Sequence, residues 1–206
     1  MSEDASTVFV VDDDESVGRA LGRLLHGAGY EVAVYTSAAE FIDCTQPDGP
    51  ACAVLDLAMP GMDGLELQAR LADENRAIGV VFLTGHGDIP ASVEAMKQGA
   101  VDFLIKPVDE SHLLQAIEVA LNRQKQIIAS RSHSAALRQR FNSLSGREQE
   151  VLRLVVDGLR NKQIAYELGI SEKTVKVHRS RVMHKTGART AAQLVRLFVA
   201  VDNIDN

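Results

Sequence analysis

Apolar runs alternate with amphipathic segments along the first part of the chain. Continuously apolar runs of strand length occur at 7–11, 31–35, 51–55, 78–83 and 100–105. Because hydrophobicity along these runs is largely continuous rather than alternating, we expect parallel strands that are covered on both faces. Helix-start signals lie between them, as in the capping-box patterns at 37–40 and 63–66. The repetition of strand and helix predicts a doubly wound α/β fold with a five-stranded parallel sheet.

The pattern changes at Leu144, after which only helical periodicity remains. The predicted helices are 145–158, 161–168 and 171–185, followed by one that begins at Thr190 or Ala191. Gly169 closes the second of them, and Ser171 caps the third. A short helix, a tight turn and a following helix are typical of a helix-turn-helix, which predicts a small all-α helix-turn-helix domain.

These patterns predict a first domain at 1–122, a partly helical linker at 123–143 and a second domain at 144–206. The linker has no acidic residue and carries the basic residues Arg123, Lys125, Arg131, Arg138 and Arg140. Apolar residues at partial heptad spacing offer two dimer seams. They are Leu114, Ile117, Leu121 and Ile128 near the linker, and Leu194, Leu197 and Val201 in the last helix. Packing inside its own domain explains Leu194 equally well.

Charge separates the two halves of the chain. Residues 1–122 carry 6 Lys and Arg against 21 Asp and Glu, and residues 123–206 carry 16 against 7, within a total net charge of −6. An acidic domain attracts cations, whereas a basic domain attracts the phosphates of nucleic acid. The asymmetry therefore favours a cation partner for the first half and nucleic acid for the second.

The apolar runs, the N-terminus and the cysteines indicate where in the cell the protein is expected. No apolar run approaches the roughly 18 residues that a membrane span needs, and the acidic N-terminus does not resemble a secretory signal. We expect a cytoplasmic protein with no membrane partner. Cys44 and Cys52 lack a CxxC spacing and a nearby His cluster, which favours buried reduced thiols over a disulfide or a zinc site.

Polar residues follow four of the five predicted strands. They are Asp12, Asp13 and Asp14 after the first, Asp56 after the third, Thr84 after the fourth and Lys106 after the fifth. In a doubly wound sheet these positions meet at the carboxyl edge. A hard divalent cation relieves the repulsion between such carboxylates, and Mg²⁺ is the best candidate. Asp56 is then placed to attack a phosphoryl group, whose oxygens Lys106 and Thr84 would contact.

Four motifs here resemble the receiver domain of two-component response regulators. They are VVDDD at 10–14, DLAMPGMDG at 56–64, LTGHGDIP at 83–90 and DFLIKP at 102–107. The resemblance implies a flavodoxin-like receiver in which Asp56 accepts phosphate from a histidine of a sensor kinase. It also implies that Asp13, Asp56 and the carbonyl of Ala58 bind Mg²⁺ directly, while Asp12 acts largely through water.

The resemblance further implies phosphoryl contacts from Thr84 and Lys106 and a switching role for Phe103. Each role has a simpler alternative, since aspartates after strands also cap helices and Phe103 can be plain core. The family carries a cis bond before the proline that matches Pro107, although X-Pro bonds default to trans. His86 is expected to be a surface loop residue, and Asp14 falls where the family varies.

The third predicted helix of the second domain has two different faces. On a helical wheel of about 100° per residue, the core face carries Val175, His178 and Val182. The opposite face carries Lys173, Lys176, Val177, Ser180 and His184. Lysine can reach guanine acceptors or phosphates in the major groove, and valine can contact a thymine methyl group. We therefore expect this face to read DNA, with a solvated lysine face as the alternative.

The segment at 144–187, LSGREQEVLRLVVDGLRNKQIAYELGISEKTVKVHRSRVMHKTG, resembles the helix-turn-helix of the LuxR/NarL/FixJ class. The resemblance implies base contacts from Lys176 and Val177, with Ser180 as a further candidate where some members have a basic residue. Phosphate contacts are implied for Asn161, Lys162, Thr174, Arg179 and Lys185. Gly146 departs from the proline that the family usually has there. The two domains together most resemble the FixJ branch.

We therefore expect a phosphorylation-dependent transcriptional activator rather than an enzyme. It would form a homodimer on activation, bind double-stranded promoter DNA and act on RNA polymerase. One alternative is a haloacid-dehalogenase-like phosphatase, because 12–14 contain DxD, but this leaves DLAMPGMDG and the helix-turn-helix unexplained. Another is a DNA-binding protein with a vestigial receiver, against which the complete set of acids, Thr and Lys speaks.

Overall fold

The computed structural model describes residues 6–43, 47, 49–85 and 89–202. The chain forms two compact units with the boundary between Ala129 and Ser130, and each unit is described by itself. Within the described residues, no helix is both long and apolar enough to cross a membrane.

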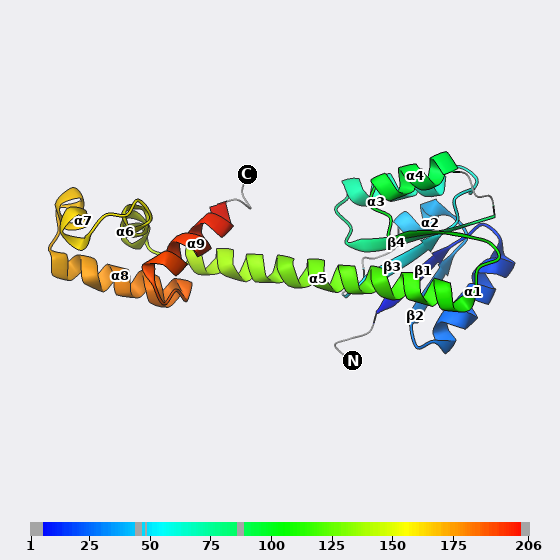
Figure 1. Ribbon diagram of the computed structural model, residues 1–206, viewed down its shortest axis with the longest axis horizontal. Helices are drawn as coiled ribbons and strands as arrows, with labels where there is room; N and C mark the ends of the chain where they lie inside the picture. Colours follow the sequence, from blue (N-terminus) through cyan, green and yellow to red (C-terminus); the bar gives the residue numbers. More distant parts are fainter. Residues whose placement is uncertain (1–5, 44–46, 48, 86–88, 203–206) are drawn as a thin grey trace. The chain divides into compact units, whose positions relative to one another are not determined.

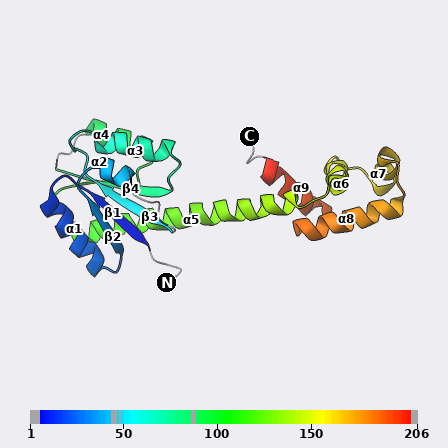
Figure 2. The ribbon, with the colours of Figure 1, turned by 180° about the vertical axis from the view of Figure 1, so that it is seen from behind.

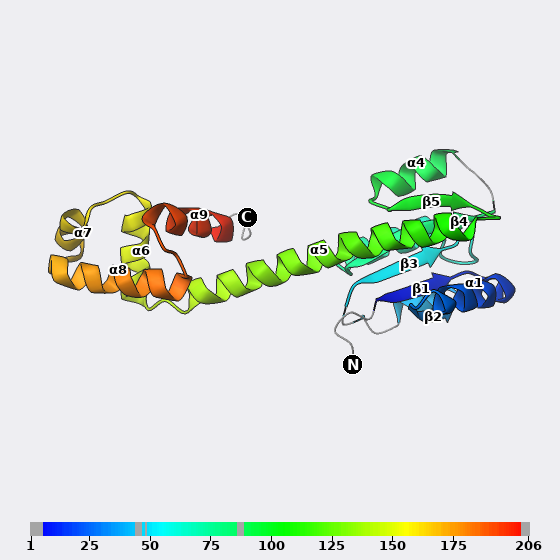
Figure 3. The same cartoon turned by 60° about the horizontal axis from the view of Figure 1, so that its bottom comes forward.

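The first unit is built on one five-stranded sheet (Figure 1). Its strands are β1 (Thr7–Val11), β2 (Glu31–Tyr35), β3 (Ala51–Leu55), β4 (Ile78–Thr84) and β5 (Asp102–Ile105). They pair in parallel in the order β2-β1-β3-β4-β5, and Figure 3 shows β5 and β2 at the two sides of the sheet. The predicted α/β fold is confirmed. β5 begins at Asp102 rather than at residue 100.

Helices cover both faces of this sheet, as Figures 1 and 2 show from opposite sides. They are α1 (Glu15–Gly27), α2 (Ala38–Ile42), α3 (Gly64–Asp73), α4 (Ile89–Lys97) and α5 (Glu110–Asn142). Within β1, Phe9 and Val11 pack in one core with residues of α2, α3 and α4. Val8 and Val10 pack in the other core with residues of α1 and α5. Burial on both faces is why the strand sequence is continuously apolar.

Helix α5 runs through the segment that we expected to be a partly helical linker. Ile117 and Leu121 are buried in the core of the first unit, and Leu114 packs against that core. These residues are therefore unavailable as a dimer seam, and the heptad interpretation was wrong for them. At the other end of the helix, Leu137 and Phe141 are buried in the core of the second unit.

The second unit continues with α6 (Gly146–Val156), α7 (Asn161–Leu168), α8 (Glu172–Thr186) and α9 (Ala191–Asp202). Gly169 ends α7 with a φ of 62°, a left-handed conformation that glycine adopts without strain. Ser145 and Glu148 form the predicted capping box, so α6 begins at Gly146 without a proline. Leu194 of α9 is buried in the unit's own core, and Leu197 and Val201 pack against it, which explains these positions without a dimer.

Candidate functional site

Three carboxylates gather at the carboxyl edge of the sheet. One oxygen each from Asp12, Asp13 and Asp56 lies within 4.8 Å of the other two. Asp12 is buried, Asp56 is half-buried and Asp13 is exposed. Asp14 points elsewhere, because its carboxylate caps α1 by accepting from the Ser16 amide at 2.8 Å. Of the three aspartates expected at this edge, Asp12 and Asp13 lie in the cluster with Asp56, whereas Asp14 is not part of it.

Lys106 supplies positive charge to this pocket. Its Nζ lies 2.6 Å from Asp12 Oδ2 and 3.6 Å from Asp56 Oδ1. Because Asp12 is only 3% exposed, its ion pair with Lys106 is shielded from water on one side. Asp56 Oδ1 also accepts a hydrogen bond from the Leu57 amide at 2.9 Å. One lysine thus pairs with two carboxylates of a cluster of three.

The pKa of Asp56 reflects this imbalance. Burial raises the pKa of the Asp56 carboxyl above its ordinary value, and the nearby charges of Asp12 and Asp13 raise it further. Lys106 and the Leu57 amide oppose this rise but do not cancel it. A second cation would complete the charge balance, and the oxygen-only donor set suits Mg²⁺. Ala58 lies exposed in the loop directly after Asp56.

Thr84 and Lys106, the two other polar residues predicted for this site, lie at the ends of the neighbouring strands β4 and β5. Thr84 is 2% exposed at the end of β4, and its carbonyl accepts from the Lys106 amide at 2.7 Å. This bond joins the ends of β4 and β5 beside the acidic pocket. The Lys106–Pro107 bond is cis, as the family resemblance implied.

Phe103 lies in β5 and is half-buried. Its ring centroid is 6.0 Å from that of Phe82, and it packs against the core on the α3 and α4 side of the sheet. Its place in β5, three residues before Lys106, is compatible with either a core role or a switching role. His86 and Cys44 lie outside the described residues, while Cys52 is buried in β3 as a free thiol.

Gly64 is a site residue that sequence reasoning missed. A Cβ atom at this position would lie 2.4 Å from the carbonyl oxygen of Asp56 and 2.9 Å from the Phe82 ring. Glycine therefore lets the start of α3 approach the end of β3. The sequence showed Gly64 only as a member of a capping-box pattern and of the motif at 56–64, and no periodicity reveals a backbone contact of this kind.

The residues predicted to read DNA lie on an exposed face of α8. Lys173, Lys176 and Ser180 are exposed, and Val177 is 45% exposed. On the opposite side Val175 and Val182 are buried, and His178 is half-buried. Val177 is not among the residues of the unit's core, so this face of α8 is open to a partner.

The predicted phosphate contacts fall into two groups. Lys162 is exposed, and Asn161 accepts a hydrogen bond from Arg179 at 2.7 Å, which ties the start of α7 to α8. Thr174 is half-buried, with its hydroxyl 2.8 Å from that of Ser171. These residues lie around the start of the helix-turn-helix, on α7 and α8.

Lys185 has a different environment from the other predicted contacts. Its Nζ lies 2.7 Å from Glu148 Oε2 and donates to the Ser143 carbonyl at 3.0 Å. Lys185 and the Ser145 amide hold the pKa of the buried Glu148 carboxyl at about 2. The ammonium of Lys185 is thus committed to a pair that joins α8 to α6. Sequence reasoning missed this pair because 37 residues separate its members.

Comparisons with known proteins match both units. Residues 8–118 match the model of the response regulator receiver domain, and residues 142–198 match that of bacterial regulatory proteins of the luxR family. Nodulation protein W of Bradyrhizobium diazoefficiens is 47% identical over 92% of this chain and 84% of that protein. Response regulator protein TodT of Pseudomonas putida is 42% identical over 96% of this chain and 87% of that protein.

A solved structure of the response regulator StyR is also similar. It shares 50% sequence identity and superposes with a TM-score of 0.85, covering 94% of this chain and 98% of that chain. The similarity to these proteins therefore extends over both units.

Proposed function

This chain belongs to the response regulators that join a receiver domain to a LuxR-family DNA-binding domain, and on that premise we propose that Asp56 is its phosphoacceptor. As a member of this family it is a phosphorylation-dependent transcription regulator of a two-component system. The observation that carries the assignment is the half-buried Asp56 carboxylate, which lies beside Lys106 and two further acids.

The proposed reaction moves a phosphoryl group from a phosphohistidine of a sensor kinase to Asp56. A carboxylate oxygen of Asp56 forms a bond to phosphorus while the phosphorus–nitrogen bond breaks, and the imidazole leaves with the electron pair and takes up a proton. Lys106 pairs with the charge that develops on the phosphoryl oxygens, and the Thr84 hydroxyl donates to one of them. The chain is thus a phosphate acceptor and a regulator, with no turnover of a separate substrate.

Asp12, Asp13, Asp56 and the carbonyl of Ala58 would hold Mg²⁺ in this site. The bound cation would supply positive charge to the phosphoryl oxygens as they approach the carboxylates. The assignment of Mg²⁺ to this site rests on the three clustered acids and on the raised pKa of Asp56, because both indicate a site with too little positive charge.

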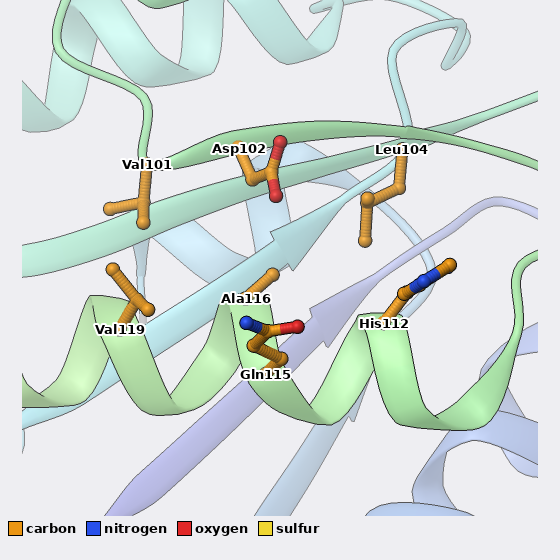
Figure 4. Close-up of a pocket in the computed structure, with 7 residues that line it drawn as sticks. All are labelled: Val101, Asp102, Leu104, His112, Gln115, Ala116 and Val119. Atoms are coloured by element: carbon orange, nitrogen blue, oxygen red, sulfur yellow. The ribbon is translucent and has the colours of Figure 1, made fainter.

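Lys106 links this chemistry to the surface formed by α4, β5 and α5. It follows β5 directly, so a shift of Lys106 toward a phosphoryl group pulls on the strand. The adjoining surface carries exposed apolar side chains: Ile89, Val93, Met96, Ile105 and Val119. A groove of about 240 Å³ lies between β5 and α5. Figure 4 shows Asp102 on its strand side and His112 and Gln115 on its helix side.

We propose that this surface forms the homodimer when Asp56 is phosphorylated. Isolated exposed apolar residues are common on monomers, but several on one face favour association. Phe103 would turn inward as β5 moves, which gives it the switching role that its position in the strand allows.

The second unit would bind promoter DNA with α8 in the major groove. Lys176 and Val177 would contact bases, with Ser180 as a further base contact and Lys173 beside them. Asn161, Lys162, Thr174 and Arg179 would contact phosphates. Lys185 would contribute there only by leaving Glu148, so we rank it last among these contacts. All these residues lie in 144–206. This is the last of the three segments that we propose from the sequence, after 1–122 and 123–143.

We further propose that the DNA-bound dimer activates RNA polymerase in the bacterial cytoplasm, where promoter DNA lies. Two copies of α8 would meet successive major grooves of a partly palindromic site. Activation and contact with the polymerase are inferred from the combination of receiver and LuxR-family domains.

The experiment that tests the phosphoacceptor is labelling by a small acyl phosphate donor with Mg²⁺, followed by intact-mass measurement. The wild-type chain and the Asp63→Asn control, altered at the cap of α3, should each gain one phosphoryl group. Asp56→Asn should gain none, because the amide is not a nucleophile. Asp12→Asn tests the phosphatase alternative, in which Asp12 carries the phosphoryl group. Labelling that persists in Asp56→Asn and disappears in Asp12→Asn would overturn the assignment.

A further inference from the structure

Two basic side chains hold the two ends of α7, the helix that leads into α8. Helices α6, α7 and α8 share one core (Figure 3). Arg147 of α6 donates through Nη2 to the carbonyl of Leu168, the last residue of α7, at 2.6 Å. Arg179 of α8 donates through Nη1 to Oδ1 of Asn161, the first residue of α7, at 2.7 Å. Each end of α7 is therefore tied to a different neighbouring helix.

The contact from Arg147 lies at the turn between α7 and α8. No amide of α7 follows the carbonyl of Leu168, so the helix cannot satisfy this acceptor itself. The amides of Gly169 and Ile170 turn back to earlier carbonyls of α7. Arg147 supplies the donor instead, and its guanidinium is held by a second contact to Glu150 of its own helix. Arg147 thus fixes the point at which the chain leaves α7 for α8.

The contact from Arg179 lies at the opposite end of α7. Arg179 and Asn161 are both half-buried, so their hydrogen bond is partly shielded from water and is stronger than one at an open surface. Arg179 follows Lys176 within one turn of α8. A guanidinium has several N–H groups, so Arg179 can hold Asn161 and still reach a phosphate. A movement at the start of α7 would therefore reach the reading part of α8 directly.

These arginines differ from the lysines of the reading face. Lys173 and Lys176 are exposed, and neither side chain has a partner among the described residues. An exposed lysine acts on DNA as a flexible charge, whereas a guanidinium bonded to protein groups has a fixed geometry. Lys185 belongs with the arginines, because its pair with Glu148 joins α8 to α6. Part of the positive charge of the second unit therefore holds its helices together.

We propose that Arg147 and Arg179 are positioning residues for sequence-specific DNA recognition, which rests on the proposed DNA-binding role of α8. They fix the ends of α7 and so set the direction in which α8 presents Lys176 and Val177 to the bases. Base contacts select a sequence only at hydrogen-bond distance, so a shift of α8 by more than about 0.5 Å weakens the selection. Phosphate contacts are less demanding, because they depend mainly on charge. Loss of either arginine therefore lowers the preference for the correct sequence more than the general affinity for DNA.

The test compares the affinity of the full-length chain, treated with an acyl phosphate and Mg²⁺, for two duplexes at fixed salt. One duplex is selected by the wild-type chain from a random pool, and the other has the same bases in scrambled order. The ratio of the two affinities is the preference. Because loss of a phosphate contact weakens both duplexes alike, the ratio reports positioning and not charge.

The outcome for the wild-type chain separates this inference from the proposed function. If the wild-type chain selects no duplex, the proposed DNA-binding function fails and the inference falls with it. If the wild-type chain selects a duplex and the variants keep its preference, the inference alone fails.

Arg147→Met keeps an apolar side chain but removes the donor to Leu168. The preference should fall at least fivefold, with less than a twofold change in affinity for the scrambled duplex. Arg153→Met is the matched control and should keep the preference, because Arg153 is an exposed arginine of the same helix without a side-chain partner among the described residues. Arg147→Lys keeps a donor and should have an intermediate preference. A lowered unfolding temperature with an unchanged preference of the folded chain would show a purely structural role and overturn the proposal for Arg147.

Arg179 and Asn161 give an independent test, which decides the proposal if Arg147→Met does not fold. Arg179→Met and Asn161→Ala should each lower the preference at least fivefold. The double variant should lower it no further, because both changes break the same contact. An unchanged preference in Arg179→Met, or effects that multiply in the double variant, would contradict the positioning role of Arg179.

Discussion

The acidic pocket of the receiver and the basic face of α8 handle charge in opposite ways. In the pocket, Asp12 and Asp56 are at least partly buried and interact with each other and with Lys106. On α8, Lys173 and Lys176 are exposed, and no partner is recorded for them within the described residues. Buried charges change pKa values and respond to one added ion, whereas exposed charges respond to a polyanion and to salt.

This difference suits a switch. A single phosphoryl group changes the balance of a tight, partly desolvated cluster by several charge-assisted contacts. The reading face needs no such tuning, because its specificity comes from where Lys176 and Val177 are presented. Phosphorylation and DNA binding therefore both depend on charge–charge interactions, the first in a partly buried site and the second at an exposed surface.

Gly64→Ala should produce the largest change on the receiver side. The added Cβ would lie 2.4 Å from the Asp56 carbonyl oxygen, which is backbone and cannot rotate away. We expect a loss of about 3 kcal/mol in unfolding free energy, at the upper end of common overpacking costs, and much slower labelling of Asp56. Thermal unfolding and phosphorylation rate measure the two effects. The control is Gly146→Ala, where a Cβ meets nothing within 4 Å; a similar loss there would contradict the contact.

Mg²⁺ should stabilise the receiver nearly as much. The pKa of Asp56 is raised in the folded chain, so without metal the stability falls as pH rises from the unfolded value through the folded one. At a concentration of one hundred times its Kd, Mg²⁺ should add about 2.7 kcal/mol, with the larger gain on the alkaline side. Thermal unfolding with and without Mg²⁺ measures this, and Asp56→Asn should lose most of the gain. An undiminished gain in that variant would place the cation elsewhere.

On the DNA side, Lys176→Ala should cost about 2 kcal/mol in binding to the preferred site, or roughly 30-fold in affinity, and should relax the sequence preference. Lys162→Ala is the matched comparison, because a phosphate contact weakens all sequences alike and lowers the salt slope by about 1. Selection of bound sequences from a random pool separates the two. An unchanged preference in Lys176→Ala would remove this residue from the reading face.

The smallest expected effect concerns the pair between Glu148 and Lys185. The pKa of Glu148 is about 2 in the folded chain, below its ordinary value of 4.5. Its contribution to stability is therefore complete above pH 4.5 and is lost as pH falls toward 2. Lys185→Met should lower the stability of the second unit at pH 7 by about 1–2 kcal/mol, because one end of the pair is partly exposed. Unfolding at pH 7 and pH 3 tests this, and the deficit should shrink at the lower pH.

Sequence reasoning predicted the strands, the helix-turn-helix and the acidic pocket because each depends on local periodicity or on the rule that parallel strands end at one edge. The wheel for α8 separated Val175 and Val182 from Lys176 and Val177 for the same reason. Periodicity describes single elements only, however. The partial heptad spacing assigned Ile117 and Leu121 to a dimer seam, whereas both are buried in the core of their own unit.

Contacts between distant segments were beyond the sequence. The pair of Glu148 with Lys185 and the approach of Gly64 to the Asp56 carbonyl depend on how helices and strands come together in space. The burial of Leu137 and Phe141 in the second unit's core depends on the helix continuing through the expected linker. No local propensity encodes these distances.

The most direct test of the account is the affinity of the full-length chain for its selected DNA site before and after phosphorylation, at fixed salt and with Mg²⁺ present. Phosphorylation should tighten binding by at least tenfold and convert the bound species to a dimer, while Asp56→Asn should show neither change. Equal affinity and equal oligomeric state of the phosphorylated and unphosphorylated chain would contradict it.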